Sequence, residues 1–151
     1  MIFKLTPACK DYLWGGNTLK TSYGKNYDGD VLAETWELSC HPDGPSVISG
    51  GEYDGKTLAD YLAQHPEALG NAPARFEEFP ILIKLIDAAK DLSIQVHPDN
   101  AYAKAHENQY GKTEMWYVVE AQPGAGLYYG FEHEISAEEF REAIENNTLC
   151  D

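Results

Sequence analysis

The residue types best suited to chemistry stand close together in the second part of the chain. The run 92–97 (LSIQVH) alternates apolar and polar residues, which predicts a half-buried strand with Gln95 and His97 on one face. Glu114 begins a second strand-like run, and Lys112 stands shortly before it. Imidazole and carboxylate form an ordinary zinc pair, whereas a glutamine amide is a weaker donor. A metal ion beside an ammonium group would suit chemistry on an anionic, oxygen-rich substrate.

Each of these assignments has a structural alternative. A lone histidine on a strand is more often a structural residue than a ligand. Pro98, however, ends the expected strand directly after His97 and so places the histidine at a rim, where pockets form. Gln95 also fits a hydrogen-bonding neighbour of the site rather than a ligand. Lys112 also fits an exposed turn, and its interest comes from the adjacent Glu114.

Lys84 is the second informative residue, because it interrupts the apolar run 80–86 (PILIKLI). A charge in the middle of such a strand costs free energy unless it is paired or faces a wet cavity, which favours a functional role. The alternative is an edge strand whose lysine reaches solvent.

Three further polar residues, Glu34, Glu37 and His41, are weaker candidates. Their neighbours favour a strand over 33–40, on which position 34 faces opposite to positions 37 and 41. We therefore expect solvated acidic residues here and no ligand set.

Composition restricts the class of protein. The chain has 151 residues, enough for one domain with a real core, and its 25 acidic and 11 basic residues give a net charge of -14. This charge argues against nucleic acid and anionic membranes as partners, so a phosphate-bearing ligand must be met by local Lys or Arg. No apolar run approaches a membrane span, and Cys9, Cys40 and Cys150 fit free thiols in a reducing compartment. We expect a cytoplasmic protein.

Short extended runs dominate the chain and predict a mainly β fold, a β-sandwich or barrel. Helical patterns are fewer, and we expect the helices to lie at the periphery of the sheets. The last helical pattern begins with a capping box of Ser136 and Glu139. The expected strands are 3–5, 33–40, 45–49, 81–87, 92–97, 115–120 and 126–131, and the expected helices are 56–64, 100–107 and 136–146.

Several of these segments together resemble the N-terminal half of a type I mannose-6-phosphate isomerase of the shorter bacterial kind. The matching stretches are WGG at 14–16, ETWELS at 34–39, HPDG at 41–44, FPILIK at 79–84, LSIQVHPD at 92–99 and GKTEMWY at 111–117. They occur in the family's order and cover nearly the whole chain. The last two are the most specific.

The resemblance implies a cupin-like jelly-roll β-sandwich with a few peripheral helices and a zinc ion (Zn2+). In the family Gln, His, Glu and a further His hold the metal, and the first three fall at Gln95, His97 and Glu114. The further His and the active-site Arg lie downstream, beyond this sequence. We therefore expect residues 1–151 to form a single cupin-like domain, the N-terminal half of a longer isomerase, and to be nearly inactive alone.

The resemblance also implies the reaction, an interconversion of mannose 6-phosphate and fructose 6-phosphate through a cis-enediol(ate). Lys112 would act beside the metal on the sugar oxygens or in ring opening, and Lys84 and Ser93 would contact the phosphosugar. The longer enzymes commonly carry a His discussed as an acid or base at the position of Gly111, so that role does not transfer. The base that moves the proton is not identified by the sequence.

Two other function classes share the predicted fold. One is a stand-alone cupin module that binds a sugar or a metal without catalysis. The other is a metal-dependent cupin oxygenase, which usually draws its histidines from paired cupin motifs that are not found here.

Overall fold

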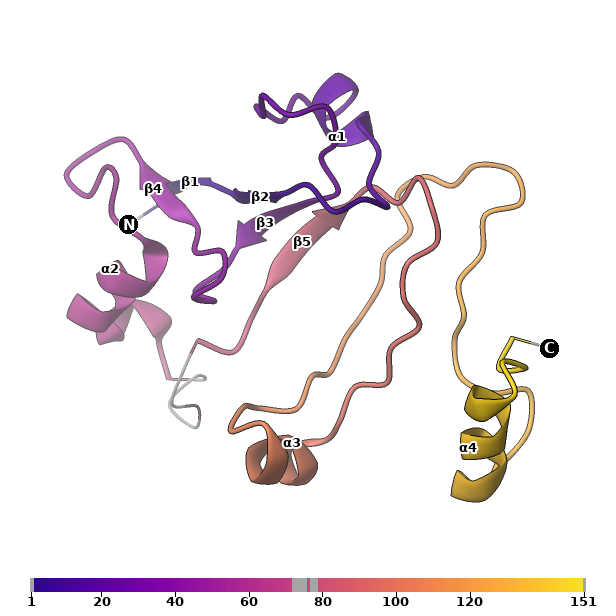
Figure 1. The fold of residues 1–151 in the computed structure, drawn as a ribbon. Coiled ribbons are helices and arrows are strands. Elements are labelled where there is room, and N and C mark those ends of the chain that lie inside the picture. The colour runs from indigo at the N-terminus through magenta and orange to yellow at the C-terminus, as the bar shows by residue number, and fades with distance from the viewer. Residues whose placement is uncertain (1, 72–75, 77–78, 151) are drawn as a thin grey trace. The chain divides into compact units, whose positions relative to one another are not determined.

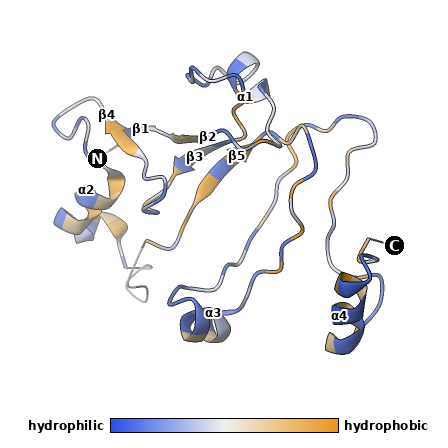
Figure 2. Ribbon diagram, viewed as in Figure 1, coloured by the Kyte–Doolittle hydropathy of each residue, from blue (hydrophilic) through white to orange (hydrophobic). Residues whose placement is uncertain are grey.

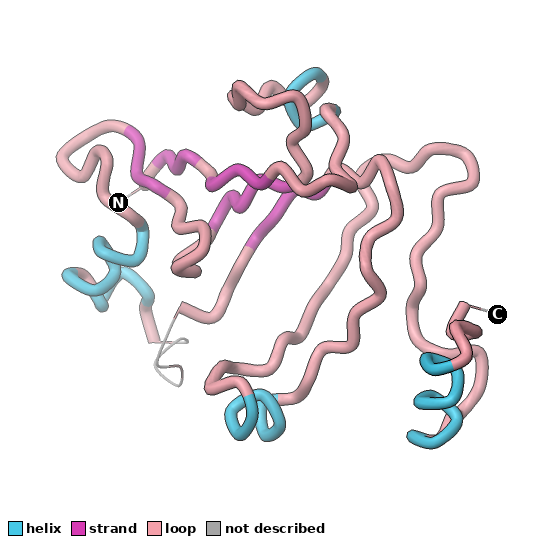
Figure 3. The backbone as a smooth tube through the Cα atoms, in the orientation of Figure 1, coloured by secondary structure: helices cyan, strands magenta, loops and turns pink. Residues whose placement is uncertain are grey.

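The computed structural model describes residues 2–71, 76 and 79–150. The fold is mainly β with a few helices, as predicted (Figures 1 and 3). The chain divides into two compact units, Met1–Ser93 and Ile94–Asp151. The first unit contains β1 (Lys4–Thr6), β2 (Ala8–Lys10), α1 (Thr18–Thr21), β3 (Glu34–Leu38), β4 (Val47–Ser49), α2 (Leu58–Gln64), the short 3-10 helix η1 (Pro66–Leu69) and β5 (Ile83–Ile86). The second contains α3 (Asn100–His106) and α4 (Ala137–Glu145).

Two small antiparallel sheets organise the first unit, and neither closes into a barrel. One pairs β1 with β4, and the other has the order β2-β3-β5. In the second sheet Lys10 lies opposite Glu34, and Trp36 lies between Ala8 and Lys84. Residues directly opposite each other point to the same face of a sheet. Lys10, Glu34, Trp36 and Lys84 therefore share one face.

The core of the first unit includes side chains on β4 and just before β3. Leu32 and Ile48 are almost completely buried, and Figure 2 shows apolar residues concentrated on β4 and β5. The buried Ser46 hydroxyl donates to the Trp36 carbonyl oxygen at 3.1 Å and accepts from the Ser39 amide at 3.0 Å. This serine thus ties the end of β3 to the segment that leads into β4, and it does so without leaving its own hydroxyl unsatisfied.

The glycine pair before α1 packs closely against two later segments. A Cβ on Gly15 would collide with Ala33, and one on Gly16 would lie 2.6 Å from a carboxylate oxygen of Asp87. The same Asp87 carboxylate accepts a hydrogen bond from the Thr18 amide at 2.6 Å, at the start of α1. Glycine is therefore required here by close approach of the backbone.

The three predicted helices are confirmed to within a residue or two at each end, and a side chain caps each one. The Thr57 side chain accepts from the Asp60 amide before α2, and Asp99 accepts from the Tyr102 amide before α3. The capping box predicted for Ser136 is present at α4. No helix among the described residues is both long and apolar enough to cross a membrane.

The four predicted strands up to residue 87 are confirmed, and the three later ones are wrong. The runs 92–97, 115–120 and 126–131 form no strand, although their sequences alternate or are strongly apolar. An extended segment is stabilised as a strand only when a neighbouring edge takes up its backbone groups and covers its apolar side chains. Most apolar side chains of these runs stay exposed, Tyr117 to 83% and Tyr129 to 99%.

We expect Ile48→Ala to lower the free energy of unfolding of the first unit by about 2–5 kcal/mol, because it leaves a cavity among buried side chains. Urea denaturation followed by fluorescence measures the change. Ile2→Ala is the matched control, since Ile2 is 98% exposed. Equal losses for the two variants would contradict the position of the core.

Candidate functional site

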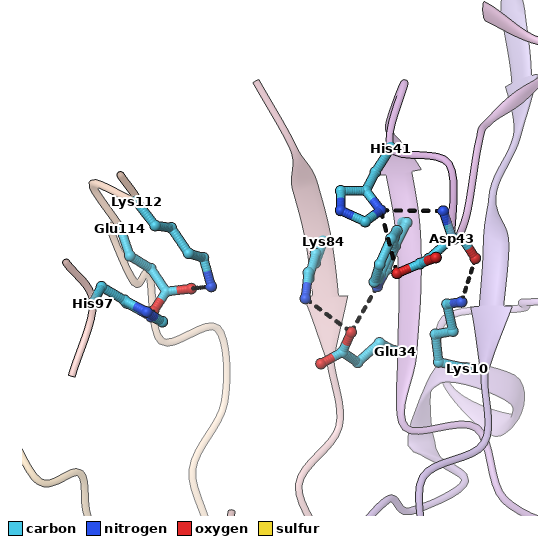
Figure 4. Close-up of polar contacts among 9 residues, drawn as sticks. Lys10, Glu34, His41, Asp43, Lys84, His97, Lys112 and Glu114 are labelled. Atoms are coloured by element: carbon cyan, nitrogen blue, oxygen red, sulfur yellow. Dashed lines mark hydrogen bonds and ion pairs between the residues drawn. The ribbon is translucent and has the colours of Figure 1, made fainter. Parts of the chain in front are cut away.

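Three of the predicted site residues meet in the second unit. The Glu114 carboxylate lies 3.0 Å from His97 Nε2 through Oε2 and 2.9 Å from Lys112 Nζ through Oε1 (Figure 4). All three side chains remain partly exposed, that of Lys112 most. An imidazole, a carboxylate and an ammonium group are thus brought to one point from positions separated by α3.

Backbone contacts around α3 hold this arrangement. The Lys112 amide donates to the Pro98 carbonyl oxygen at 3.3 Å, and the Gly111 amide donates to the Asn100 side chain at 2.9 Å. A Cβ on Gly111 would lie 2.6 Å from the Asn100 nitrogen and would collide with the Asp99 carbonyl carbon. Close packing therefore excludes a side chain at position 111 without a backbone shift.

The surroundings of Glu114 keep its carboxylate ionised. Burial acts to raise the pKa of Glu114, but hydrogen bonds from Lys112, Trp116 and His97, together with the charge of Lys112, outweigh burial and lower the pKa to about 2. A carboxylate that is charged at neutral pH is a competent ligand for a divalent metal. The same low pKa makes Glu114 a weak proton acceptor near pH 7.

His97 and Glu114 supply two of the ligand types that zinc prefers. The described residues contain no group of three or more His, Cys, Asp and Glu side chains placed to hold a metal, so among these four residue types His97 and Glu114 stand here as a pair. Gln95, the third predicted ligand, and Ser93 are exposed, and each has an interaction of its own. The donor chemistry fits zinc, and its completion requires further ligands.

A second polar cluster lies on the three-stranded sheet of the first unit. Glu34 is only 6% exposed, and its Oε2 accepts from Lys84 Nζ at 3.0 Å and from Trp36 Nε1 at 2.6 Å. The Lys84 ammonium also lies 4.7 Å from the centre of the Trp36 ring system. Lys84 is therefore paired inside the unit, and the interpretation of Glu34 as a solvated residue is wrong.

Sequence reasoning missed Glu34 because it treated the strands separately. The alternation over 33–40 assigns faces but does not say which face is buried. The available signal was a carboxylate in one predicted strand and a lone ammonium in another, which the antiparallel pairing of β3 with β5 brings together.

The rim of this cluster is formed by the turn after β3. The His41 ring meets the Trp36 ring edge-on at 5.6 Å, and the His41 Nδ1 accepts from the Asp43 amide at 3.1 Å. The Lys10 ammonium donates to the Asp43 carbonyl oxygen at 2.6 Å and lies 4.6 Å from the centre of the Trp36 ring (Figure 4). Charged groups thus flank one indole on the same sheet face.

Comparison with known proteins identifies the family. The family described as phosphomannose isomerase type I, catalytic domain, matches residues 2–122. The chain belongs to this family. It is 46% identical over 132 residues to the mannose-6-phosphate isomerase of Streptococcus mutans, a match that covers 87% of this chain and 41% of the relative. It is 38% identical over 125 residues to the isomerase ManA of Bacillus subtilis, covering 82% of this chain and 39% of the relative.

Solved structures of phosphomannose isomerases agree with this family assignment. The mannose 6-phosphate isomerase from Bacillus subtilis matches with a TM-score of 0.66 and 40% identity over 71% of this chain and 34% of that one. A variant of the phosphomannose isomerase from Salmonella typhimurium matches with a TM-score of 0.60 and 35% identity, over 70% of this chain and 29% of that one. The chain spans well under half the length of the curated relatives it matches.

We expect Lys84→Met to lower the free energy of unfolding by about 3 kcal/mol, because the buried Glu34 carboxylate would lose its cation. Chemical denaturation at neutral pH measures the loss. Adding Glu34→Gln should recover part of it, since the double variant buries no uncompensated charge. Lys25→Met is the control, because its partner Glu37 is more exposed and such pairs contribute about 1 kcal/mol or less. A Lys84→Met variant no less stable than Lys25→Met would contradict the buried pair.

Proposed function

We propose that this chain is part of a zinc-dependent aldose-ketose isomerase that interconverts mannose 6-phosphate and fructose 6-phosphate through a cis-enediol(ate). The observation that supports the proposal most is the contact of His97, Glu114 and Lys112 at one point of a chain from the type I phosphomannose isomerase family. The names of the relatives supply the substrate.

In this proposal His97 and Glu114 are the metal ligands, and Gln95 is a weaker third. The ionised state of Glu114 and its distance of 3.0 Å from His97 Nε2 support the pair. Zinc usually takes about four ligands, so the site is completed by residues outside this sequence, among them the further His that the family resemblance implies. When bound, zinc would act as a Lewis acid toward a substrate oxygen.

Lys112 has the role of a catalytic cation. Its ammonium is fixed against Glu114 and remains exposed enough to donate to a sugar oxygen as well. Proton transfer between neighbouring carbons builds negative charge on the oxygens of the enediolate, and a fixed positive charge at those oxygens lowers the barrier. In the same role Lys112 would donate to the ring oxygen when the sugar opens.

Lys84 and Ser93 have the role of phosphosugar contacts. Lys84 supplies a local cation in a chain whose net charge of -14 would otherwise repel a phosphate. Its position against Trp36 restricts the ammonium to a narrow range of directions, which favours binding over free solvation. Ser93 offers a hydroxyl that donates to phosphate or sugar oxygens.

A coupled assay for fructose 6-phosphate formation, run on the longest reading frame that contains this sequence, tests the proposal. We expect turnover of mannose 6-phosphate by that protein and very little by residues 1–151 alone, since the ligand set of the short chain is incomplete. Zinc or sugar binding by the longer protein without turnover would instead support the non-catalytic cupin module. Comparable turnover by the two proteins would contradict the proposed domain organisation.

Glu114→Ala in the longer protein should remove tight zinc binding, because an ionised ligand is replaced by a methyl group. Elemental analysis after dialysis gives the zinc content per chain. Glu120→Ala, at an exposed carboxylate outside the cluster, should leave the zinc content unchanged. Full zinc content in the Glu114→Ala protein would rule out the ligand assignment.

A further inference from the structure

The sheet face that carries Glu34 also carries two lysines. Lys10 on β2 lies opposite Glu34, and Lys84 on β5 lies opposite Trp36, so both approach the indole from strands on either side of β3. Their ammonium groups lie 4.6 Å and 4.7 Å from the centre of the Trp36 ring. Two like charges beside one aromatic ring repel each other, and an anion next to either of them relieves that repulsion.

The two lysines differ in how far their charge is already neutralised. Lys84 faces the carboxylate of Glu34, whose side chain is 8% exposed, so solvent screens this pair only weakly. Lys10 donates to a neutral acceptor, the backbone oxygen of Asp43, and an ammonium group has three N–H donors in all. The charge of Lys10 is therefore less compensated by a hydrogen-bonded carboxylate than that of Lys84.

The other charged groups near this face do not remove the difference between Lys10 and Lys84. The Asp43 carboxylate is 78% exposed and lies 3.7 Å from His41 Nδ1, so water screens its field. Lys25 pairs with Glu37, which accepts a hydrogen bond from Thr35. Thr35 and Glu37 alternate along β3 with Glu34 and Trp36, so they belong to the opposite face of the sheet.

We propose that Lys10 is a further substrate-binding residue, whose ammonium meets the phosphate or another anionic oxygen of the sugar beside the Trp36 indole. The inference rests on the proposed function, because it takes the phosphosugar as the ligand. It also assigns a role to Glu34: this carboxylate holds Lys84 in place and at the same time opposes any anion that approaches. Removing the charge of Lys10 should therefore weaken phosphate binding, and removing the charge of Glu34 should strengthen it.

Steady-state kinetics of the longer protein give the first test. Lys10→Gln should raise KM for mannose 6-phosphate roughly tenfold or more, since it removes a charge-assisted hydrogen bond, and should change kcat far less. Lys10→Arg, which keeps the charge, should stay close to the wild type. Lys25→Gln is the matched control and should leave KM unchanged. An unchanged KM in Lys10→Gln overturns the inference.

Phosphate titration of the 151-residue chain gives a second test that does not depend on turnover. The indole N–H signal of Trp36, assigned with Trp36→Phe, is followed in ¹⁵N–¹H spectra as inorganic phosphate is added. We expect saturable shifts in the wild type, roughly tenfold weaker binding in Lys10→Gln and tighter binding in Glu34→Gln. Equal affinity in Lys10→Gln, weaker binding in Glu34→Gln, or no shift in the wild type overturns the inference.

The two tests separate failure of this inference from failure of the proposed function. If the longer wild-type protein does not isomerise mannose 6-phosphate, the proposed function fails, while the phosphate titration still decides whether Lys10 binds an anion. If the wild type turns over and Lys10→Gln keeps the wild-type KM, only the role of Lys10 fails.

Discussion

The buried carboxylate of Glu34 is the charge on which the three-stranded sheet of the first unit depends. A carboxylate that is 6% exposed is tolerated only with strong donors, and Glu34 finds them in Lys84 and in the indole of Trp36. These contacts also fix the pairing of β3 with β5. A slip by one residue would move Lys84 to the other face and leave Glu34 without its cation. The same interaction thus sets the register and aims a lysine at the face proposed to bind substrate.

In the second unit charged groups are brought together without a sheet. A hydrogen bond from the Lys112 amide to the Pro98 carbonyl oxygen brings the segment of Glu114 to that of His97, and this close approach requires a glycine at position 111. The 3.0 Å contact between His97 Nε2 and the Glu114 carboxylate occupies the ring nitrogen that would also bind a metal. A metal ligand must offer a lone pair at this nitrogen, so a bound metal would replace the contact between His97 and Glu114.

The sequence predicts those secondary-structure elements whose stabilising contacts are local or lie within the same unit. The helix ends were predictable because caps such as Ser136 with Glu139 act within a few residues. The strands around Trp36 and Lys84 were predictable because each finds a partner inside the same unit. The run 115–120 was not predictable, because its apolar residues indicate what the segment would bury if it were paired and say nothing about whether a partner strand is present. Strand formation is decided by non-local contacts.

The site shows the same division between local and non-local information. Spacing and residue type predicted the grouping of His97, Lys112 and Glu114, which the structure brings into contact, and their roles stay predictions. Glu34 was missed because burial of a charge depends on a donor fifty positions away in the chain. The ammonium groups of Lys84 and Lys112 are each paired with a glutamate, which fixes their position and partly neutralises their charge. Lys10 differs from both, because its ammonium is held by a neutral group, the backbone carbonyl oxygen of Asp43. In an acidic chain, such a cation remains available to the phosphate of the proposed substrate.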